Sequence, residues 1–294
     1  MTDALQTLVS GLALGCLYAV LALGFVVVAR ASGILNLAQG SFVVLGAYLA
    51  YAFIHQAGMN FWVGVILSMA CVAVFAVLLE AFIVHRVTDH FAALLVTFGV
   101  TIAIGPLATA FWPGDSLNLD DPWALEVLRV GGIGITARDA TLIPITAVLL
   151  LLFFLFFRFT RVGLSLRATA IDSEAAMAQG ISTRFVFGVS WGIAGALGAF
   201  GGVVLSTTVG GGVRPGLEVY AFLALPVIIL GGLESPLGAV VGGLIIGVVQ
   251  QFAVTLVPAE WGSGFAEVVP YLVMLVILLI RPAGLFGRKE IRRA

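Results

Sequence analysis

Long apolar runs separated by short polar stretches dominate this chain. The hydrocarbon core of a bilayer is about 30 Å thick, so a helix needs roughly 20 apolar residues to cross it. We therefore expect an all-α, polytopic integral membrane protein with about eight or nine transmembrane helices. The runs that predict these spans cover residues 5–29, 35–54, 62–84, 91–112, 141–157, 185–207, 220–232, 237–257 and 265–280.

The run at residues 220–232 is unusually short for a span. It contains Pro226 and ends in Gly231 and Gly232, all of which interrupt helices. Irregular backbone at membrane depth is tolerated where protein or a cavity shields it. The sequence leaves open whether this run crosses the membrane or re-enters on the same side.

The arginines indicate an orientation. Residues 158–184 carry four arginines, whereas residues 113–140 carry five acidic residues and two arginines. Cytoplasmic loops are enriched in Lys and Arg, so we expect the first segment inside and the second outside. With nine spans, the basic C-terminal tail also lies inside and the N-terminus lies outside.

Composition supports a membrane protein. Hydrophobic residues make up 61% of the chain and charged residues only 10%, against about 25% charged in ordinary soluble domains. The net charge of −1 gives no basic surface for nucleic acid. No polar stretch is long enough to bury a second core, so residues 1–294 are expected to form one transmembrane domain.

The sequence lacks residues that two ways of driving transport, ATP hydrolysis and ion coupling, usually require. The only lysine is Lys289, and no Gly-Lys-Ser/Thr phosphate-binding loop is present. If ATP drives transport, another chain must hydrolyse it, so we expect neither an enzyme nor a bound cofactor or metal here. Ion-coupled carriers usually keep acidic or His side chains at mid-depth, which this sequence mostly lacks. An ATP-independent carrier or channel remains an alternative.

One enzymatic motif needs weighing. Residues 188–192 match the G-x-S-x-G pattern of a nucleophile elbow, which requires a strand, a turn and a helix. The motif lies inside an apolar run without a nearby histidine, so an intramembrane serine protease is disfavoured. Instead, glycines recur every three or four residues, which is typical of tight helix packing. They are Gly188, Gly192, Gly195, Gly198 and Gly202.

A short helix is predicted inside the cytoplasmic segment. Asp172 or Ser173 is a suitable N-cap, and Glu174 in the first turn suits the helix dipole. Gly180 stands where a helix of about two turns would end. We expect a small, weakly apolar helix that faces the cytoplasm.

The motif in this helix resembles the EAA loop of ABC importer permeases. The residues that carry the resemblance are Glu174, Ala175, Ala176 and Gly180. In that family the loop forms a coupling helix that rests in a groove on the ATPase subunit. The resemblance implies that this helix, with Asp172 as its cap and Arg167 on the preceding stretch, docks on an ATPase. An ordinary amphipathic surface loop is the alternative.

The remaining motifs extend the resemblance over essentially the whole chain. The sequence is similar to the LivH-like permeases of the branched-chain amino-acid ABC importer family. The stretches that carry this similarity are LNLAQG with Gly46-Ala47-Tyr48, VGLSLRATAIDSEAAMAQGIS, VIILGGLESPLGAVVGG and RPAGLFGR.

The resemblance implies a permease domain in the bacterial inner membrane that acts within an assembly. The implied partners are a LivM-like second permease, two ATP-binding ABC subunits and a periplasmic substrate-binding protein. Branched-chain amino acids are the implied substrates, and urea, short amides or aromatic acids are the alternatives. Gln39 stands where many relatives carry His. This difference leaves the identity of the substrate less well determined than the type of transporter.

Two polar residues are candidates for the translocation path. Asn36 and Gln39 are three residues apart, so we expect them to share one face of a helix near the inner end of the second span. They either line the path or form interhelical hydrogen bonds, and the second interpretation is favoured. Gln250 and Gln251 have the same two interpretations.

Overall fold

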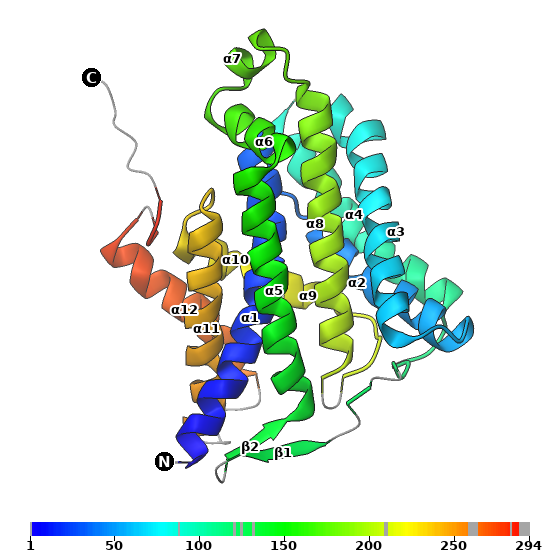
Figure 1. Ribbon diagram of the computed structural model, residues 1–294, viewed down its shortest axis with the longest axis vertical. Helices are drawn as coiled ribbons and strands as arrows, with labels where there is room; N and C mark the ends of the chain where they lie inside the picture. Colours follow the sequence, from blue (N-terminus) through cyan, green and yellow to red (C-terminus); the bar gives the residue numbers. More distant parts are fainter. Residues whose placement is uncertain are drawn as a thin grey trace.

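The structure, a computed structural model, describes residues 2–87, 89–119, 122–123, 126–130, 133–208, 211–257, 264–282 and 284–287. It is a bundle of helices with one short hairpin (Figure 1). The longer helices are α1 (Thr2–Ser32), α3 (Phe61–Phe82), α4 (His90–Phe111), α5 (Ala137–Phe159), α8 (Thr183–Ser206) and α11 (Pro236–Leu256). The shorter ones are α2 (Gln39–Tyr51), η1 (Ala52–Gln56), η2 (Val84–Arg86), α6 (Arg161–Ile171), α7 (Ser173–Ala178), α9 (Glu218–Phe222), α10 (Ala224–Gly231) and α12 (Phe265–Ile280).

The predicted helical membrane architecture is confirmed. Within the described part of the chain, six helices are long and apolar enough to cross a membrane. The α2–η1, α9–α10 and α12 segments are shorter and cover the three remaining predicted spans. Many large apolar side chains point outward from the peripheral helices, for example Ile66, Phe111 and Leu279. Such extensive apolar exposure fits a surface that faces lipid or partner helices.

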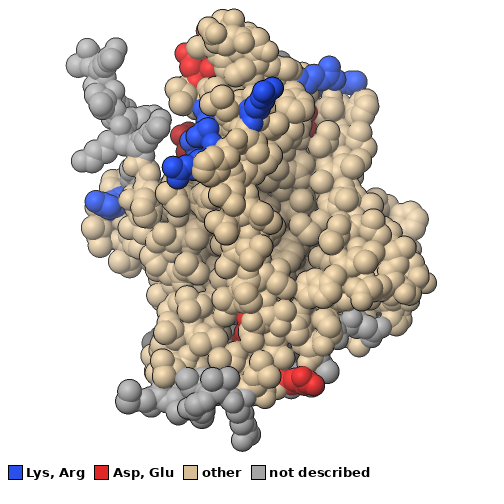
Figure 2. All heavy atoms as spheres, viewed as in Figure 1, with Lys and Arg blue, Asp and Glu red and all other residues tan. Residues whose placement is uncertain are grey.

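The two ends of the bundle differ in charge. Helices α6 and α7 lie at one end, and the β1–β2 hairpin lies at the other (Figure 1). On the face shown in Figure 2, the Lys and Arg side chains gather at the α6–α7 end. This arrangement agrees with the orientation that the sequence predicts, with α6 and α7 on the cytoplasmic side. We call the two ends inner and outer accordingly.

The short run at 220–232 crosses the bundle as a broken helix. Before α9, Val213 pairs with Leu117 of the outer segment. After α10, Glu234 lines the same cavity as Arg30, which is in the last turn of α1 at the inner end. The break falls at Leu223, between α9 and α10. The question that the sequence left open is thus answered in favour of a crossing.

The second span begins later than predicted. α2 starts at Gln39 rather than at residue 35. Gly33 adopts a positive φ of 70°, and the Asn36 side chain accepts a hydrogen bond from the Ala38 N–H over 3.0 Å. Such local bonds compete with helix formation. The prediction that Asn36 and Gln39 share a helix face is therefore wrong, because Asn36 lies in the turn before the helix.

A hairpin adds to the predicted all-helical fold. β1 (Val127–Val130) and β2 (Ile133–Thr136) pair antiparallel, with Val127 opposite Thr136. Thr136 also caps α5, since its hydroxyl accepts a hydrogen bond from the Asp139 N–H over 3.1 Å. The hairpin thus leads directly into the next membrane helix.

The glycines of α8 let three helices pack closely against it. A methyl group at Gly195 would lie 2.7 Å from the carbonyl oxygen of Val72 on α3, and one at Gly198 would lie 2.7 Å from Cβ of Phe42 on α2. Gly201 similarly faces α1. These separations leave no room for a side chain without movement. The interpretation of the glycine pattern as a packing face is confirmed for Gly195 and Gly198, and Gly201 adds a position that the pattern did not include.

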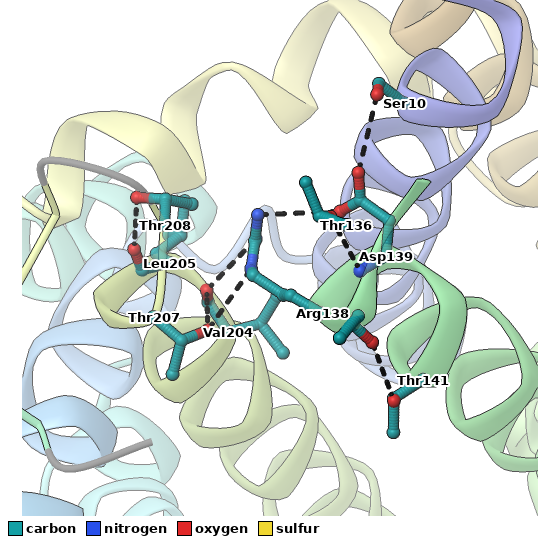
Figure 3. A network of polar contacts seen from close by, with 10 residues as sticks. Ser10, Thr136, Arg138, Asp139, Thr141, Val204, Leu205, Thr207 and Thr208 are labelled. Atoms are coloured by element: carbon teal, nitrogen blue, oxygen red, sulfur yellow. Dashed lines mark hydrogen bonds and ion pairs between the residues drawn. The ribbon is translucent and has the colours of Figure 1, made fainter. Parts of the chain in front are cut away.

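A polar network ties α1, α5 and α8 together at the outer end (Figure 3). The Arg138 guanidinium lies 3.6 Å from the Asp139 carboxylate and donates to the Val204 carbonyl and the Thr207 hydroxyl over 3.4 and 3.3 Å. Ser10 donates to the other oxygen of Asp139 over 3.4 Å. Asp139 is buried, so these contacts compensate for the desolvation of its charge.

Candidate functional site

Local bonds define both ends of α7. The Asp172 carboxylate accepts hydrogen bonds from the N–H groups of Glu174 and Ala175 over 3.0 and 2.9 Å. At the other end, Gly180 has a φ of +82°, and the N–H of Ile181 donates to the Ala176 carbonyl over 3.1 Å. This is the Schellman arrangement, in which a left-handed residue closes the helix. The predicted helix, its cap and its terminating glycine are all present.

The preceding helix α6 was not anticipated. Thr160 caps it by accepting a hydrogen bond from the Gly163 N–H over 2.9 Å. Its apolar residues Leu166 and Val162 pack with Val186 of α8 and Ala31 of α1. α6 therefore rests on the inner ends of two membrane helices, and α7 follows it directly.

The inner end presents apolar side chains to its surroundings. Ala176 is buried, whereas Glu174 and Ala175 are exposed. The large apolar side chains that are at least half exposed around them are Leu164, Ile171, Met177 and Phe185. We use the name inner patch for these four residues together with Glu174 and Ala175, which makes six residues in all. A patch of this kind at the inner end of the bundle is typical of a protein-docking surface.

Arg167 lies on a different part of the segment. Its guanidinium donates to the Arg158 carbonyl at the end of α5 over 3.3 Å, and its Nε is buried without a partner among the described residues. The side chain lines a cavity of about 1100 Å³, and no residue of α7 lines that cavity. Arg167 and the exposed residues of α7 therefore do not form a common site.

Gln39 makes an interhelical hydrogen bond. Its side chain is fully buried, and its Nε2 donates to the Ala194 carbonyl of α8 over 3.2 Å. The glycines Gly24 and Gly198 make room for it, because a methyl group at either position would crowd its amide. The Gln39 Oε1 and the Asn36 Nδ2 have no partner among the described residues. Both residues keep hydrogen-bonding capacity inside the bundle.

Two other sequence candidates have structural roles. Gln250 is buried and accepts a hydrogen bond from the Tyr18 hydroxyl over 2.7 Å, which links α11 to α1. Ser190, of the G-x-S-x-G pattern, lies within α8 and donates to the Phe187 carbonyl one turn earlier over 2.7 Å. The strand and turn of a nucleophile elbow are absent from this helical segment, so the pattern has no catalytic geometry.

The sequence analysis missed one acidic residue, Glu218, that has a buried carboxylate oxygen. Glu218 is the first residue of α9, in the first half of the broken crossing, and its Oε2 is buried without a hydrogen-bond partner among the described residues. Two glycines face it: Gly105 of α4, where a methyl group would lie 3.8 Å from Glu218 Oε1, and Gly40 of α2. A lone acidic residue just before a broken apolar run was the available signal.

Comparisons of sequence agree with the motifs. The chain matches the family described as the branched-chain amino acid transport system permease component over residues 7–278. It is 26% identical to the high-affinity branched-chain amino acid transport system permease protein LivH of Escherichia coli (strain K12), over 98% of this chain and 97% of that protein. It is 28% identical to the corresponding protein BraD of Pseudomonas aeruginosa, with the same coverage.

A comparison of structures supports the fold. A chain of PsaBC from Streptococcus pneumoniae, solved in complex with Fab, superposes with a TM-score of 0.54. The match covers 95% of this chain and 91% of that chain, at 15% sequence identity. At this identity the likeness concerns the architecture alone.

Proposed function

Because the chain belongs to the permease family of the branched-chain amino acid transport systems, we propose that it is the membrane-spanning subunit of an ATP-driven importer in the bacterial inner membrane. The observation that carries this proposal is the capped helix α7 beside the inner patch. A short, rigid helix with small side chains suits docking into a groove on another protein, and the sequence offers no phosphate-binding loop of its own.

We place the coupling to ATP hydrolysis at α7. Asp172 and Gly180 fix the helix, Ala175 permits close approach, and Glu174 offers a negative charge to a basic partner residue. Ala176 anchors the helix to the chain beneath it. The ATPase pair closes when it binds ATP, and α7 moves with it.

Arg167 passes that movement onward in this proposal. Its bond to the Arg158 carbonyl joins α6 to the last turn of α5. α6 also packs on α8 and α1 through its apolar side. A displacement of α7 is thereby delivered to the inner ends of three membrane helices. Packed helices respond to such a displacement as rigid bodies, which is the kind of two-state element that coupling requires.

We propose that the translocation path runs beside α2, α4 and α9. Asn36 and Gln39 provide amide groups in the part of the bundle near the start of α2. Glu218 provides a carboxylate oxygen without a partner between two glycines. A zwitterionic amino acid needs a few polar groups in an otherwise apolar passage. Glu218 suits the ammonium group of such a substrate.

The proposed assembly contains a LivM-like second permease, two ABC ATPases and a periplasmic binding protein that delivers substrate. The exposed apolar faces of α3 and α4 are available to a second permease. Branched-chain amino acids are the proposed cargo, with urea, short amides or aromatic acids as the alternative class.

Uptake by the reconstituted assembly tests this proposal. Proteoliposomes with ATP inside and the binding protein outside should accumulate labelled leucine, isoleucine or valine only when ATP is hydrolysed. Competition by unlabelled urea, acetamide and phenylalanine would identify the alternative substrates. Accumulation by this chain alone, without ATP or partner subunits, would contradict the importer and indicate a carrier or channel.

A further inference from the structure

The inner cavity introduced with Arg167 has a mixed lining. Its charged side chains are Arg30, Arg158, Arg167 and Glu234, so it has an excess of positive charge. Its apolar side chains come from α5, α6, α10 and α12 and include Phe153, Phe157, Ile171, Ile229 and Leu278. The volume of about 1100 Å³ exceeds what a single small ion needs.

Part of the apolar lining lies deeper along the membrane helices than the charged side chains. Arg30 and Arg158 are in the last turns of the membrane helices α1 and α5. Phe153 and Phe154 precede Arg158 by about one turn, which places them roughly 6–8 Å deeper along the helix. The cavity therefore offers cations at the level of the membrane surface and hydrocarbon just below it. This order matches a phospholipid, whose charged headgroup sits above its acyl chains.

We propose that this cavity binds the headgroup of an anionic phospholipid from the inner leaflet, with the upper acyl chains against the phenylalanines of α5. Basic pockets between membrane helices on the cytoplasmic side recognise such headgroups. Arg167 lines the cavity with the guanidinium whose Nη2 also donates to the Arg158 carbonyl over 3.3 Å. Arg158 lies over the ring of Phe159, with 5.4 Å between guanidinium carbon and ring centroid, which steadies it.

The lining of the cavity argues against two other occupants, the chain's own C-terminal tail and a free phosphate ion. The chain's own C-terminal residues 288–294 carry four basic residues and one acidic residue, and such a tail is repelled by a positive cavity. The apolar lining at depth in turn favours a lipid over a free phosphate ion.

Native mass spectrometry of the full-length chain in mild detergent tests the proposal. The chain is titrated with phosphatidylglycerol and with phosphatidylcholine of identical acyl chains. We expect one tightly retained phosphatidylglycerol and no equivalent phosphatidylcholine. The double variant R158Q/R167Q should bind phosphatidylglycerol about 25-fold more weakly, because each arginine near an anionic headgroup contributes roughly a factor of five.

Two further variants make the result specific. R161Q/R184Q removes the same charge from exposed arginines outside the cavity and should leave the retained lipid unchanged. E234Q should strengthen retention by about fivefold, and it reports on the cavity even if R158Q/R167Q does not fold. Equal retention of the two lipids, equal weakening by both arginine pairs, or displacement of phosphatidylglycerol by excess inorganic phosphate would overturn the proposal.

Discussion

The carboxylate of Asp172 accepts a hydrogen bond from the N–H of Ala175 over 2.9 Å. This bond joins Asp172, which lies between α6 and α7, to one of the alanines that α7 exposes. It satisfies a backbone donor that the helix itself cannot pair. The cap thus sets the direction in which α7 leaves α6, and with it the position of the proposed docking surface.

Removal of this cap should weaken coupling. Asp172→Ala should destabilise α7 by about 1 kcal/mol and lower ATP-driven uptake about fivefold, with an unchanged amount of protein in the membrane. Asp172→Asn keeps a capping oxygen and should retain most of the uptake. Initial uptake rates, normalised to membrane protein, measure both variants. Native rates for the alanine variant would show that the cap has no part in coupling.

The left-handed residue that ends α7 gives a second prediction. Gly180→Val forces a β-branched side chain into a φ of +82°, at a cost of about 1–2 kcal/mol. No atom lies within 4 Å of the added Cβ, so the damage should stay local. Uptake should fall at least tenfold, while the amount of this chain in the membrane stays unchanged.

Gly58 provides a matched control for this variant. It has a φ of +65° and also has open space around its Cβ position, but it lies between η1 and α3, far along the chain from α7. Gly58→Val should impose similar backbone strain and leave uptake near the native rate. If both valine variants lose uptake equally, the loss caused by Gly180→Val reflects general instability. The assignment of α7 as the coupling helix then loses its support.

The packing of α8 on α2 gives a third prediction. A methyl group at Gly202 would overlap the carbonyl group of Val43, so Gly202→Ala should destabilise the fold by about 1–3 kcal/mol. Gly99 on α4 has no atom within 4 Å of its Cβ position, and Gly99→Ala should preserve or slightly raise stability. Thermal unfolding midpoints in detergent distinguish them. Equal midpoints would mean that α8 is packed less tightly than the structure shows.

The outer network gives a fourth prediction. Arg138→Ala should cost about 3 kcal/mol, because it leaves the buried Asp139 carboxylate without its nearest cation. Adding Asp139→Asn removes the unpaired charge and should recover part of that loss. Denaturant titration gives the free energy of unfolding of the native chain, of Arg138→Ala and of the double variant. A double variant less stable than Arg138→Ala would show that Asp139 is stabilised mainly by other groups.

Local chemistry made α7 predictable from the sequence. Asp172, the alanines and Gly180 act through bonds between near neighbours, so their pattern determines a short helix without help from the rest of the chain. The long spans were predictable for a similar reason, since hydropathy reports the length of chain that lipid can surround. Their order and number follow directly from the apolar runs.

Contacts of individual polar side chains account for what the sequence did not predict. Residues 35–38 are largely apolar and were predicted as the start of a helix, yet the Asn36 side chain bonds locally and α2 begins only at Gln39. Arg167 was expected beside α7, but the nearby Arg158 carbonyl draws its guanidinium into the cavity. Glu218 becomes notable only because Gly40 and Gly105, distant in sequence, lie opposite it. Hydropathy carries no information about such pairings.

The most direct test of the central claim is purification of the tagged chain from its native membranes in mild detergent, followed by mass spectrometry of the co-purifying proteins. The proposed importer predicts recovery of a second permease and of ABC ATPases with phosphate-binding loops, and loss of the ATPases from the Gly180→Val chain but not from Gly58→Val. Recovery of the chain alone, in a state that still moves solute across liposomes without ATP, would contradict it.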